Sequence, residues 1–105
     1  MSLRSIVPFE ARKLIDEGAI LVDVREAKEH ARENIPGARL QPLSAPDSPP
    51  PGLTAGKPVI FHCQSGARTS MNARRLAARL PAGADGYVLA GGIEAWRRAG
   101  LPTGR

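Results

Sequence analysis

Three short apolar runs constrain the fold of this chain more than any other feature of its sequence. They are AILVDV at residues 19–24, PVIFHC at residues 58–63 and GYVLAG at residues 86–91. Each run is continuously apolar rather than alternating, which is typical of strands buried on both faces, as parallel sheets require. A fourth, shorter strand is expected at ARLQ, residues 38–41.

Segments of helical character separate these strands. Apolar residues recur at helical spacing after Pro8, which suits the first turn of a helix, and Gly18 is a suitable C-terminal cap. Further helices are expected at residues 25–33, 73–80 and 93–100. Strands that alternate with helices predict an α/β fold, in which a parallel sheet is covered on both faces and ligands bind beyond the carboxyl ends of the strands.

Length and composition are those of one compact domain. The 105 residues predict a single domain over residues 1–105, within which the proline-rich segment 42–57 forms a loop. Hydrophobic residues make up 42% and charged residues 24%, which excludes a disordered chain. The net charge of +5 should attract anions. Two phenylalanines, one tyrosine and one tryptophan are too few for a protein that stacks nucleic-acid bases, so no nucleic-acid partner is expected.

The cellular setting is predicted from what the sequence lacks. A single cysteine cannot form an internal disulfide, so the fold does not depend on an oxidising compartment. No apolar stretch follows Arg4 as a signal peptide would require, and no run of ~18 apolar residues is present to span a membrane. We therefore expect a cytoplasmic protein, and membrane attachment would require an anchor beyond Arg105.

The only cysteine, Cys63, lies where a strand is expected to end and a helix to begin. Unpaired backbone N–H groups in such a loop point toward an anion, and these sites can lower a thiol pKa to ~3.5–7.5. Gly66 lets the backbone approach a ligand closely, and Arg68 offers a planar fork of donors to a tetrahedral oxyanion. Hydroxyl donors are added by Ser65, Thr69 and Ser70. FHCQSGARTS therefore predicts a thiolate nucleophile in an anion-binding loop, able to attack either phosphorus or the outer sulfur of a donor.

Four stretches carry a resemblance to a known family. They are LVDVRE at 21–26, NIPGA at 34–38, VIFHCQSGARTS at 59–70 and GYVLAGGIEAWRRAGLP at 86–102. In this order they resemble the single-domain rhodanese-like sulfurtransferases over nearly the whole chain. The resemblance implies an α/β rhodanese-like fold with about five parallel strands and helices on both faces, and it implies no cofactor.

The resemblance also implies roles for particular residues. Cys63 would be the nucleophile and would carry the transferred sulfur as a persulfide, while Arg68 would bind an anionic donor, either thiosulfate or a persulfide. Loop groups that would line the donor site belong to Gln64, Ser65, Gly66, Ala67 and Thr69. Asp23 and Arg25 would form a buried ion pair or line the pocket mouth, and we expect them to support the site rather than to react. A thiol or cyanide would accept the sulfur.

The length of the loop separates the two chemistries. Four residues stand between Cys63 and Arg68, whereas the loop of the related dual-specificity phosphatases is one residue longer and makes room for phosphate. Thiosulfate:acceptor sulfurtransferase activity is therefore expected, and Arg68 favours thiosulfate over 3-mercaptopyruvate. Ala67 stands where many active members have a polar or basic residue, which predicts modest efficiency. Two alternatives remain: a phosphatase or arsenate reductase, and a sulfur-carrying or regulatory module without turnover.

The remaining conspicuous side chains are expected to be structural. His62 should point to the face of the sheet opposite Cys63, His30 should face solvent, and Trp96 should pack against the sheet. The spacing of the two histidines and the cysteine does not suit a metal ion, so no metal is expected. A solvated helix face is expected at Arg74, Arg75 and Arg79.

Overall fold

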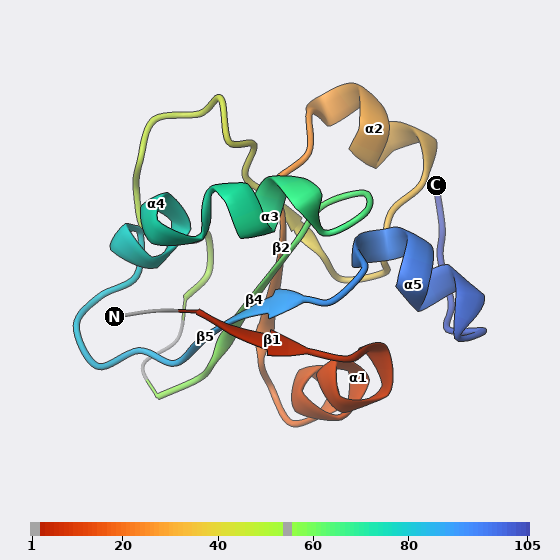
Figure 1. Ribbon diagram of the computed structural model, residues 1–105, viewed down its shortest axis with the longest axis horizontal. Coiled ribbons are helices and arrows are strands. Elements are labelled where there is room, and N and C mark those ends of the chain that lie inside the picture. The colour runs from red at the N-terminus through yellow and green to blue at the C-terminus, as the bar shows by residue number, and fades with distance from the viewer. Residues whose placement is uncertain (1–2, 54–55) are drawn as a thin grey trace.

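In the computed structural model, residues 3–53 and 56–105 are described, and their strands form one parallel sheet in the order β1-β5-β4-β2-β3. Figure 1 shows this sheet with helices on both sides. The strands are β1 (Arg4–Ile6), β2 (Ile20–Asp23), β3 (Arg39–Leu40), β4 (Val59–His62) and β5 (Gly86–Leu89). The helices are α1 (Pro8–Asp16), α2 (Ala27–Arg32), α3 (Ala67–Met71), α4 (Ala73–Ala78) and α5 (Gly92–Arg98). The predicted five-stranded α/β fold is confirmed.

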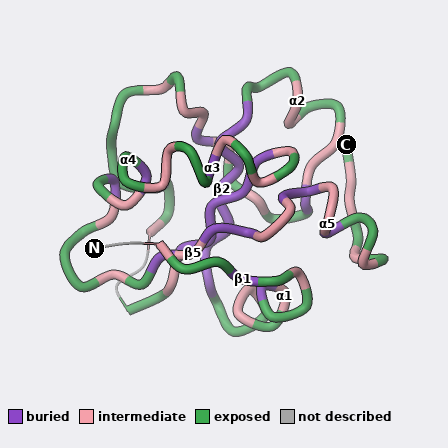
Figure 2. The backbone as a smooth tube through the Cα atoms, in the orientation of Figure 1, coloured by how far each residue is buried: buried purple, intermediate pink, exposed green. Residues whose placement is uncertain are grey.

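The central strand β4 and its neighbour β2 have the most continuous apolar sequence. Every residue of β2 and β4 is buried (Figure 2), and the strands pair in register from Ile20 opposite Val59 to Asp23 opposite His62. β1 lies at the edge beside β5, and two of its three residues are exposed. The sequence pattern located no strand at this position, because a three-residue edge strand carries no measurable hydrophobic period.

Helices cover the sheet in two groups with separate apolar clusters. On one face, α1 and α5 pack through Ala11, Ile93 and Trp96 against Leu21 and Ile60. Trp96 is buried and donates its indole N–H to the carbonyl of Pro102 at 2.8 Å, which confirms that it packs against the sheet. On the other face, α4 packs through Leu76 against a cluster that includes Val59, Phe61 and Cys63. Alternation along β4 therefore sends Cys63 and its neighbour His62 to opposite faces, as predicted.

The expected surface position of Arg79 is wrong. Its side chain is fully buried, and its Nε donates to Asp47 Oδ1 at 3.0 Å. It also donates to the carbonyl oxygens of Leu43 at 3.4 Å and Ala45 at 3.2 Å. Arg79 thus anchors the proline-rich loop to α4. Helical periodicity could not show this, because the loop that covers Arg79 lies more than thirty residues earlier in the chain.

Candidate active site

Cys63 follows β4 directly, at the carboxyl end of the sheet, and its side chain is buried. The backbone N–H of Gly66 donates to Cys63 Sγ at 3.1 Å, and the hydroxyl oxygen of Thr69 lies 3.8 Å from the same sulfur. Gly66 precedes α3 with φ of +94°, a conformation that favours glycine and turns its N–H back toward the sulfur. The loop thus provides Cys63 with a backbone donor and a neighbouring hydroxyl.

The cysteine loop rests on the first turn of α5. The N–H groups of Ile93 and Glu94 donate to the carbonyl oxygens of Cys63 at 2.9 Å and Gln64 at 3.1 Å. Gly92 makes this contact close, because a Cβ at position 92 would lie 2.5 Å from the Gln64 oxygen and 2.6 Å from the Cys63 oxygen. The Gly-Gly turn after β5 therefore serves the cysteine loop as well as the chain reversal.

This contact predicts a strong effect of one methyl group at position 92. Gly92→Ala is expected to destabilise the protein by about 2–5 kcal/mol, because it combines left-handed backbone strain with overlap against the cysteine loop. Gly100→Ala is the matched control, since Gly100 also has a positive φ of 81° but a Cβ there would contact nothing within 4 Å. It should cost about 1–2 kcal/mol. Urea denaturation measures both, and equal losses would contradict the proposed contact.

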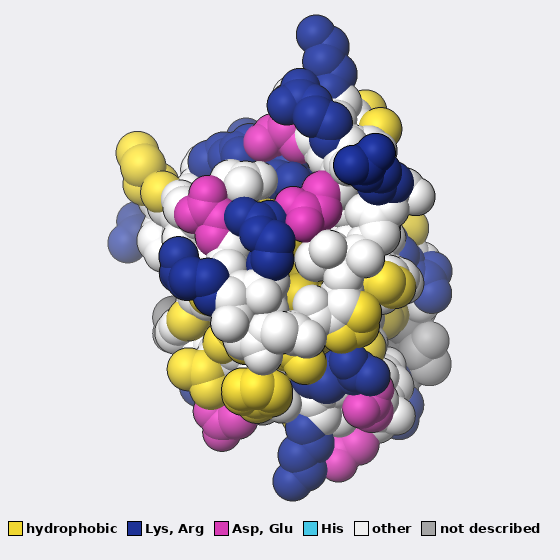
Figure 3. Space-filling model, turned by 90° about the vertical axis from the view of Figure 1, so that its right-hand side faces the viewer, with side chains coloured by type: hydrophobic (Ala, Val, Ile, Leu, Met, Phe, Trp, Pro, Cys, Tyr) yellow, Lys and Arg dark blue, Asp and Glu magenta, His cyan; other side chains and the backbone are white. Residues whose placement is uncertain are grey.

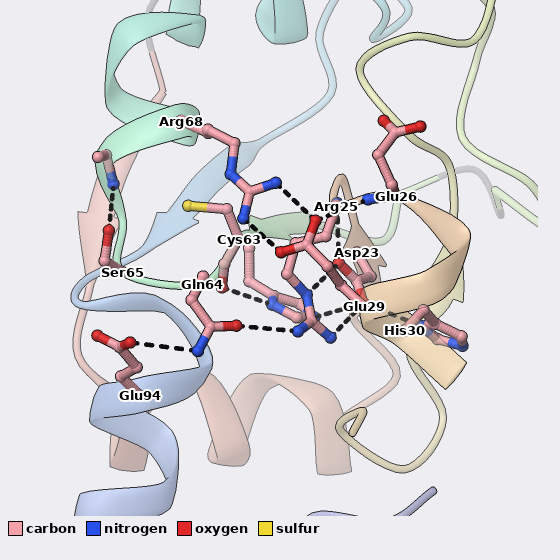
Figure 4. Close-up of polar contacts among 12 residues, drawn as sticks. Asp23, Arg25, Glu26, Glu29, His30, Cys63, Gln64, Ser65, Arg68 and Glu94 are labelled. Carbon is pink, nitrogen blue, oxygen red and sulfur yellow. Dashed lines mark hydrogen bonds and ion pairs between the residues drawn. The ribbon is translucent and has the colours of Figure 1, made fainter. Parts of the chain in front are cut away.

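A buried ion pair at the end of β2 supports the loop from the other side. Arg25 donates from Nε to Asp23 Oδ1 at 3.0 Å and from Nη2 to Asp23 Oδ2 at 2.8 Å, and both side chains are almost completely buried. Arg25 continues to the carbonyl of Glu33 at 2.6 Å and to Gln64 Oε1 at 3.1 Å. Figure 4 shows this bridge between the sheet and the cysteine loop. The structure thus shows the buried ion pair, and Arg25 alone of the two also contacts a loop residue and lines the neighbouring cavity.

His30 does not face solvent, contrary to expectation. Its Nδ1 lies 2.9 Å from Asp23 Oδ2, and about a quarter of its side chain is exposed. The short helix α2 begins soon after Arg25 and turns His30 back over the end of β2. Burial raises the pKa of Asp23, but the hydrogen bonds from Arg25 and His30, together with the nearby His62, outweigh it and hold that pKa below its usual value.

His62 is a buried ring on the far side of the sheet from Cys63. Its Nδ1 lies 3.1 Å from the Cys63 carbonyl oxygen, and its Nε2 lies 3.9 Å from Asp23 Oδ2. Burial lowers the pKa of His62 below its usual value, so the ring is neutral at neutral pH. Because it contacts the Cys63 backbone rather than the sulfur, His62 supports the loop and is not placed to remove the thiol proton.

The lowered pKa of His62 predicts acid sensitivity. The unfolded chain binds a proton at this residue at higher pH than the folded chain does, so stability is retained above pH ~6.5 and lost as pH falls below it. Between about pH 7.5 and about pH 5.5 the loss should be roughly 1 kcal/mol. Urea denaturation at both pH values measures the loss. In the variant His62→Gln, the part of this stability loss that is due to His62 should vanish. An equal loss in wild type and variant would contradict the assignment to His62.

Arg68 is held by an acidic residue that sequence inspection missed. Its two terminal nitrogens donate to the two carboxylate oxygens of Glu29, each at 2.8 Å (Figure 4). These hydrogen bonds lower the pKa of Glu29 to about 2, so the carboxylate stays charged at neutral pH. Glu29 also takes part in the N-terminal cap of α2, where its carboxylate accepts a hydrogen bond from the Glu26 N–H at 3.1 Å. The sequence signal that could have placed Glu29 on the first turn of α2 is the capping box that it forms with Glu26.

A cavity of about 950 Å³ opens beside the loop. It is lined by Arg25, Glu29, Ala31, Arg32, Glu33, Gln64, Thr103, Gly104 and Arg105. Gln64 belongs to the loop, whereas Cys63 itself does not line the cavity. On the side of the molecule that carries α2 and the C-terminus, basic and acidic side chains lie interspersed (Figure 3). The cavity is therefore adjacent to the cysteine loop, and its lining includes Gln64 and Glu29, the partner of Arg68.

Two of the predicted loop residues contact the sulfur, and the others contact one another or neighbouring segments. Gly66 and Thr69 contact Sγ, and Gln64 joins Arg25 to Glu94 through its side-chain amide. The Ala67 N–H donates instead to Ser65 Oγ at 3.4 Å.

Within residues 3–53 and 56–105, no group of three histidine, cysteine, aspartate or glutamate side chains is placed to hold a metal ion. In the same residues no helix is long and apolar enough to cross a membrane.

Fold and loop together define an α/β domain with a cysteine at the carboxyl end of its central strand. The model of the rhodanese-like domain family matches residues 7–99. The chain therefore belongs to the rhodanese-like domain family. An uncharacterised protein of Synechocystis sp. is 38% identical over 101 residues, which cover 94% of this chain and 55% of that protein. The chain thus spans about half the length of this curated relative.

Three solved structures share the fold. Thiosulfate sulfurtransferase from Pseudomonas aeruginosa is 25% identical with a TM-score of 0.82, over 97% of this chain and 19% of that one. A rhodanese-related protein from Thermoplasma volcanium is 24% identical with a TM-score of 0.77, over 96% and 97% of the two chains. A protein of unknown function from Rhodopseudomonas palustris, described as a possible tyrosine phosphatase, is 26% identical with a TM-score of 0.73, over 95% and 83%.

Proposed function

We propose that the protein is a thiosulfate:acceptor sulfurtransferase that works through a persulfide on Cys63. The observation that carries the proposal is the hydrogen bond from the Gly66 N–H to Cys63 Sγ, within a loop of four residues between Cys63 and Arg68. A donor to sulfur favours the thiolate, which is the reactive form of cysteine. The similarity to the P. aeruginosa thiosulfate sulfurtransferase supports the same chemistry.

The reaction has two displacements, both at sulfur. In the first, the Cys63 thiolate attacks the outer sulfur of thiosulfate, the S–S bond of the donor breaks, and its electron pair leaves with sulfite. In the second, a thiol or cyanide attacks the outer sulfur of the Cys63 persulfide and the thiolate is regenerated. With cyanide the product is thiocyanate. The Gly66 N–H and the Thr69 hydroxyl are placed to stabilise the negative sulfur in both states.

The acceptor and setting form part of the proposal. A thiol is the natural acceptor for a reaction that ends in a persulfide, and cyanide serves as a convenient assay acceptor. The free, buried state of Cys63 fits a reducing cytoplasm, where thiols are available and disulfides are rare. Sulfur transfer of this kind needs no metal and no cofactor, since the cysteine thiolate supplies the nucleophile.

Intact mass spectrometry tests the first displacement directly. After incubation with thiosulfate and removal of excess reagent, the protein should gain the mass of one sulfur atom, and the gain should disappear when cyanide is added and thiocyanate is released. A protein that gains sulfur but releases no thiocyanate would be a sulfur carrier. A protein that gains no sulfur from thiosulfate would overturn the proposed donor.

A cysteine-dependent phosphatase is the second candidate, because a structural relative from R. palustris is described as a possible tyrosine phosphatase. Phosphatase and arsenate-reductase chemistry would use the same thiolate against phosphorus or arsenic. Hydrolysis of p-nitrophenyl phosphate without any turnover of thiosulfate would favour this candidate. We expect the reverse result, because the short loop leaves less room for a tetrahedral phosphate around Cys63.

A further inference from the structure

We infer that Glu29 selects sulfur donors by charge, opposing dianions such as thiosulfate and favouring donors that carry one negative charge or none. The inference rests on the proposed sulfur transfer and names the class of donor that the same site accepts best. Its starting point is the pair of 2.8 Å hydrogen bonds that Arg68 donates to Glu29. Arg68 was expected to offer its positive charge to the donor, yet the structure shows that charge already matched by a carboxylate.

Both arginines that border the cysteine loop have their positive charge paired with a carboxylate. Arg68 is paired with Glu29, and Arg25 is paired with Asp23 in a buried bidentate contact. Glu94 adds a further acidic group, since it accepts from the side-chain amide of Gln64 at 3.2 Å. A dianion that reaches Cys63 therefore meets no excess of positive charge from these residues. It meets a thiolate as well, so the transition state for thiosulfate carries three negative charges, whereas a monoanionic donor brings the total to two.

The position of Glu29 gives it control over access as well as over charge. Glu29 lines the cavity beside the loop, and its carboxylate holds the end of the Arg68 side chain. About a quarter of the Glu29 side chain is exposed, so its charge reaches a molecule in the cavity with only partial screening by water. An anion in this cavity lies near the Glu29 carboxylate as well as near Arg32 and Arg105, which also line it. The repulsion from Glu29 is larger for a dianion than for a monoanion.

A purely positioning role for Glu29 makes a different prediction. If the carboxylate merely held Arg68 in a useful orientation, its removal would impair all donors to a similar degree. If it acts through charge, its removal raises the rate with a dianion relative to a monoanion. Glu29→Gln keeps the size and one hydrogen-bonding oxygen of the side chain but removes the charge. The ratio of rates for two donors therefore distinguishes the two roles.

Thiosulfate and methanethiosulfonate are the matched donors. Each presents a terminal sulfur bonded to a second sulfur, and each gives the same Cys63 persulfide, with sulfite or methanesulfinate leaving with the electron pair of the broken S–S bond. They differ by one negative charge. Glu29→Gln is expected to raise kcat/KM for thiosulfate relative to methanethiosulfonate by about ten-fold, as loss of one partly screened charge allows. An unchanged ratio, or equal losses with both donors, would overturn the inference.

Glu33→Gln is the control for the general charge of the cavity. Glu33 lines the same cavity and pairs with Arg97 instead of Arg68. This variant loses the same charge but leaves the Glu29–Arg68 contact intact, and its ratio should change by less than about two-fold. A shift as large as that of Glu29→Gln would show that any negative charge near the cavity has this effect, and the assignment to Glu29 would fail.

Alkylation of Cys63 separates this inference from the proposed function. Iodoacetate is an anion and iodoacetamide is neutral, and both alkylate the thiolate by displacement of iodide. Glu29→Gln should raise the ratio of the iodoacetate rate to the iodoacetamide rate several-fold, whether or not the protein turns over thiosulfate. An unchanged ratio overturns the role of Glu29, while a raised ratio without thiocyanate formation overturns the proposed function alone. If Cys63 resists both reagents, titration calorimetry with inorganic sulfate decides, since equal affinities in wild type and variant would overturn the inference.

Discussion

Cys63→Ser is expected to lower thiocyanate formation from thiosulfate and cyanide by roughly three orders of magnitude or more, the scale of losing the nucleophile in a covalent mechanism. A serine hydroxyl is not ionised at neutral pH and cannot store the transferred sulfur as a persulfide. No other thiol can take its place, because Cys63 is the only cysteine of the chain. Initial rates of thiocyanate formation measure the loss, and intact mass measures the missing sulfur adduct.

A second variant tests whether the loop position matters beyond the presence of a thiol. Cys63→Ser combined with Ser65→Cys places the thiol two residues further along the same loop, at an exposed position. This variant should remain inactive, because the Gly66 N–H is directed at the sulfur of residue 63. Thermal unfolding should show both variants folded. Turnover within about ten-fold of wild type in either variant would contradict Cys63 as the persulfide carrier.

The strands that the sequence predicted best are those buried on both faces. β2 and β4 have a continuous apolar sequence, and the structure places β4 at the centre of the sheet and β2 beside it, with all residues of both strands buried. β1 escaped detection because an edge strand of three residues, two of them exposed, leaves no pattern. The helix expected at residues 73–80 corresponds to α4, while α3 before it is a separate helix that ends at Met71.

The cysteine loop was predictable because its parts are contiguous in sequence. The strand, Cys63, Gly66 and the following helix can be placed from a stretch of about a dozen residues. The partners of its charged groups were not predictable in the same way. Glu29 binds Arg68 across 39 residues, and Asp47 binds Arg79 across 32 residues.

Local patterns report which face of its own helix a side chain occupies. They do not report which other segment will cover that face. For this reason the sequence showed neither the carboxylate that pairs with Arg68 nor the loop that buries Arg79, since both come from distant segments that only the tertiary structure brings together. The same limit applied to His30, whose partner Asp23 lies on β2 rather than on its own helix.

Arg25→Met is expected to destabilise the protein by about 3–5 kcal/mol, because removing one partner of a buried ion pair leaves the Asp23 carboxylate buried without its counter-charge. Asp23 is completely buried and would lose two donors at once, Nε at one carboxylate oxygen and Nη2 at the other, while the Arg25 backbone N–H remains. Arg12→Met is the matched control, because Arg12 pairs with Asp16 on the exposed face of α1. That variant should cost less than about 1 kcal/mol. Urea denaturation at neutral pH measures both.

The double variant Asp23→Leu/Arg25→Met decides whether the buried pair stabilises the fold or mainly shapes the site. Replacing both charges by apolar side chains leaves no stranded carboxylate, so a large part of the stability lost in Arg25→Met should return. Sulfur transfer should not return with it, because Gln64 would still lack the donor that Arg25 provides at 3.1 Å from the loop. Recovery of stability without activity would assign the pair to the support of the cysteine loop. Recovery of both would show that the loop holds its geometry without Arg25, and would remove the pair from the candidate site.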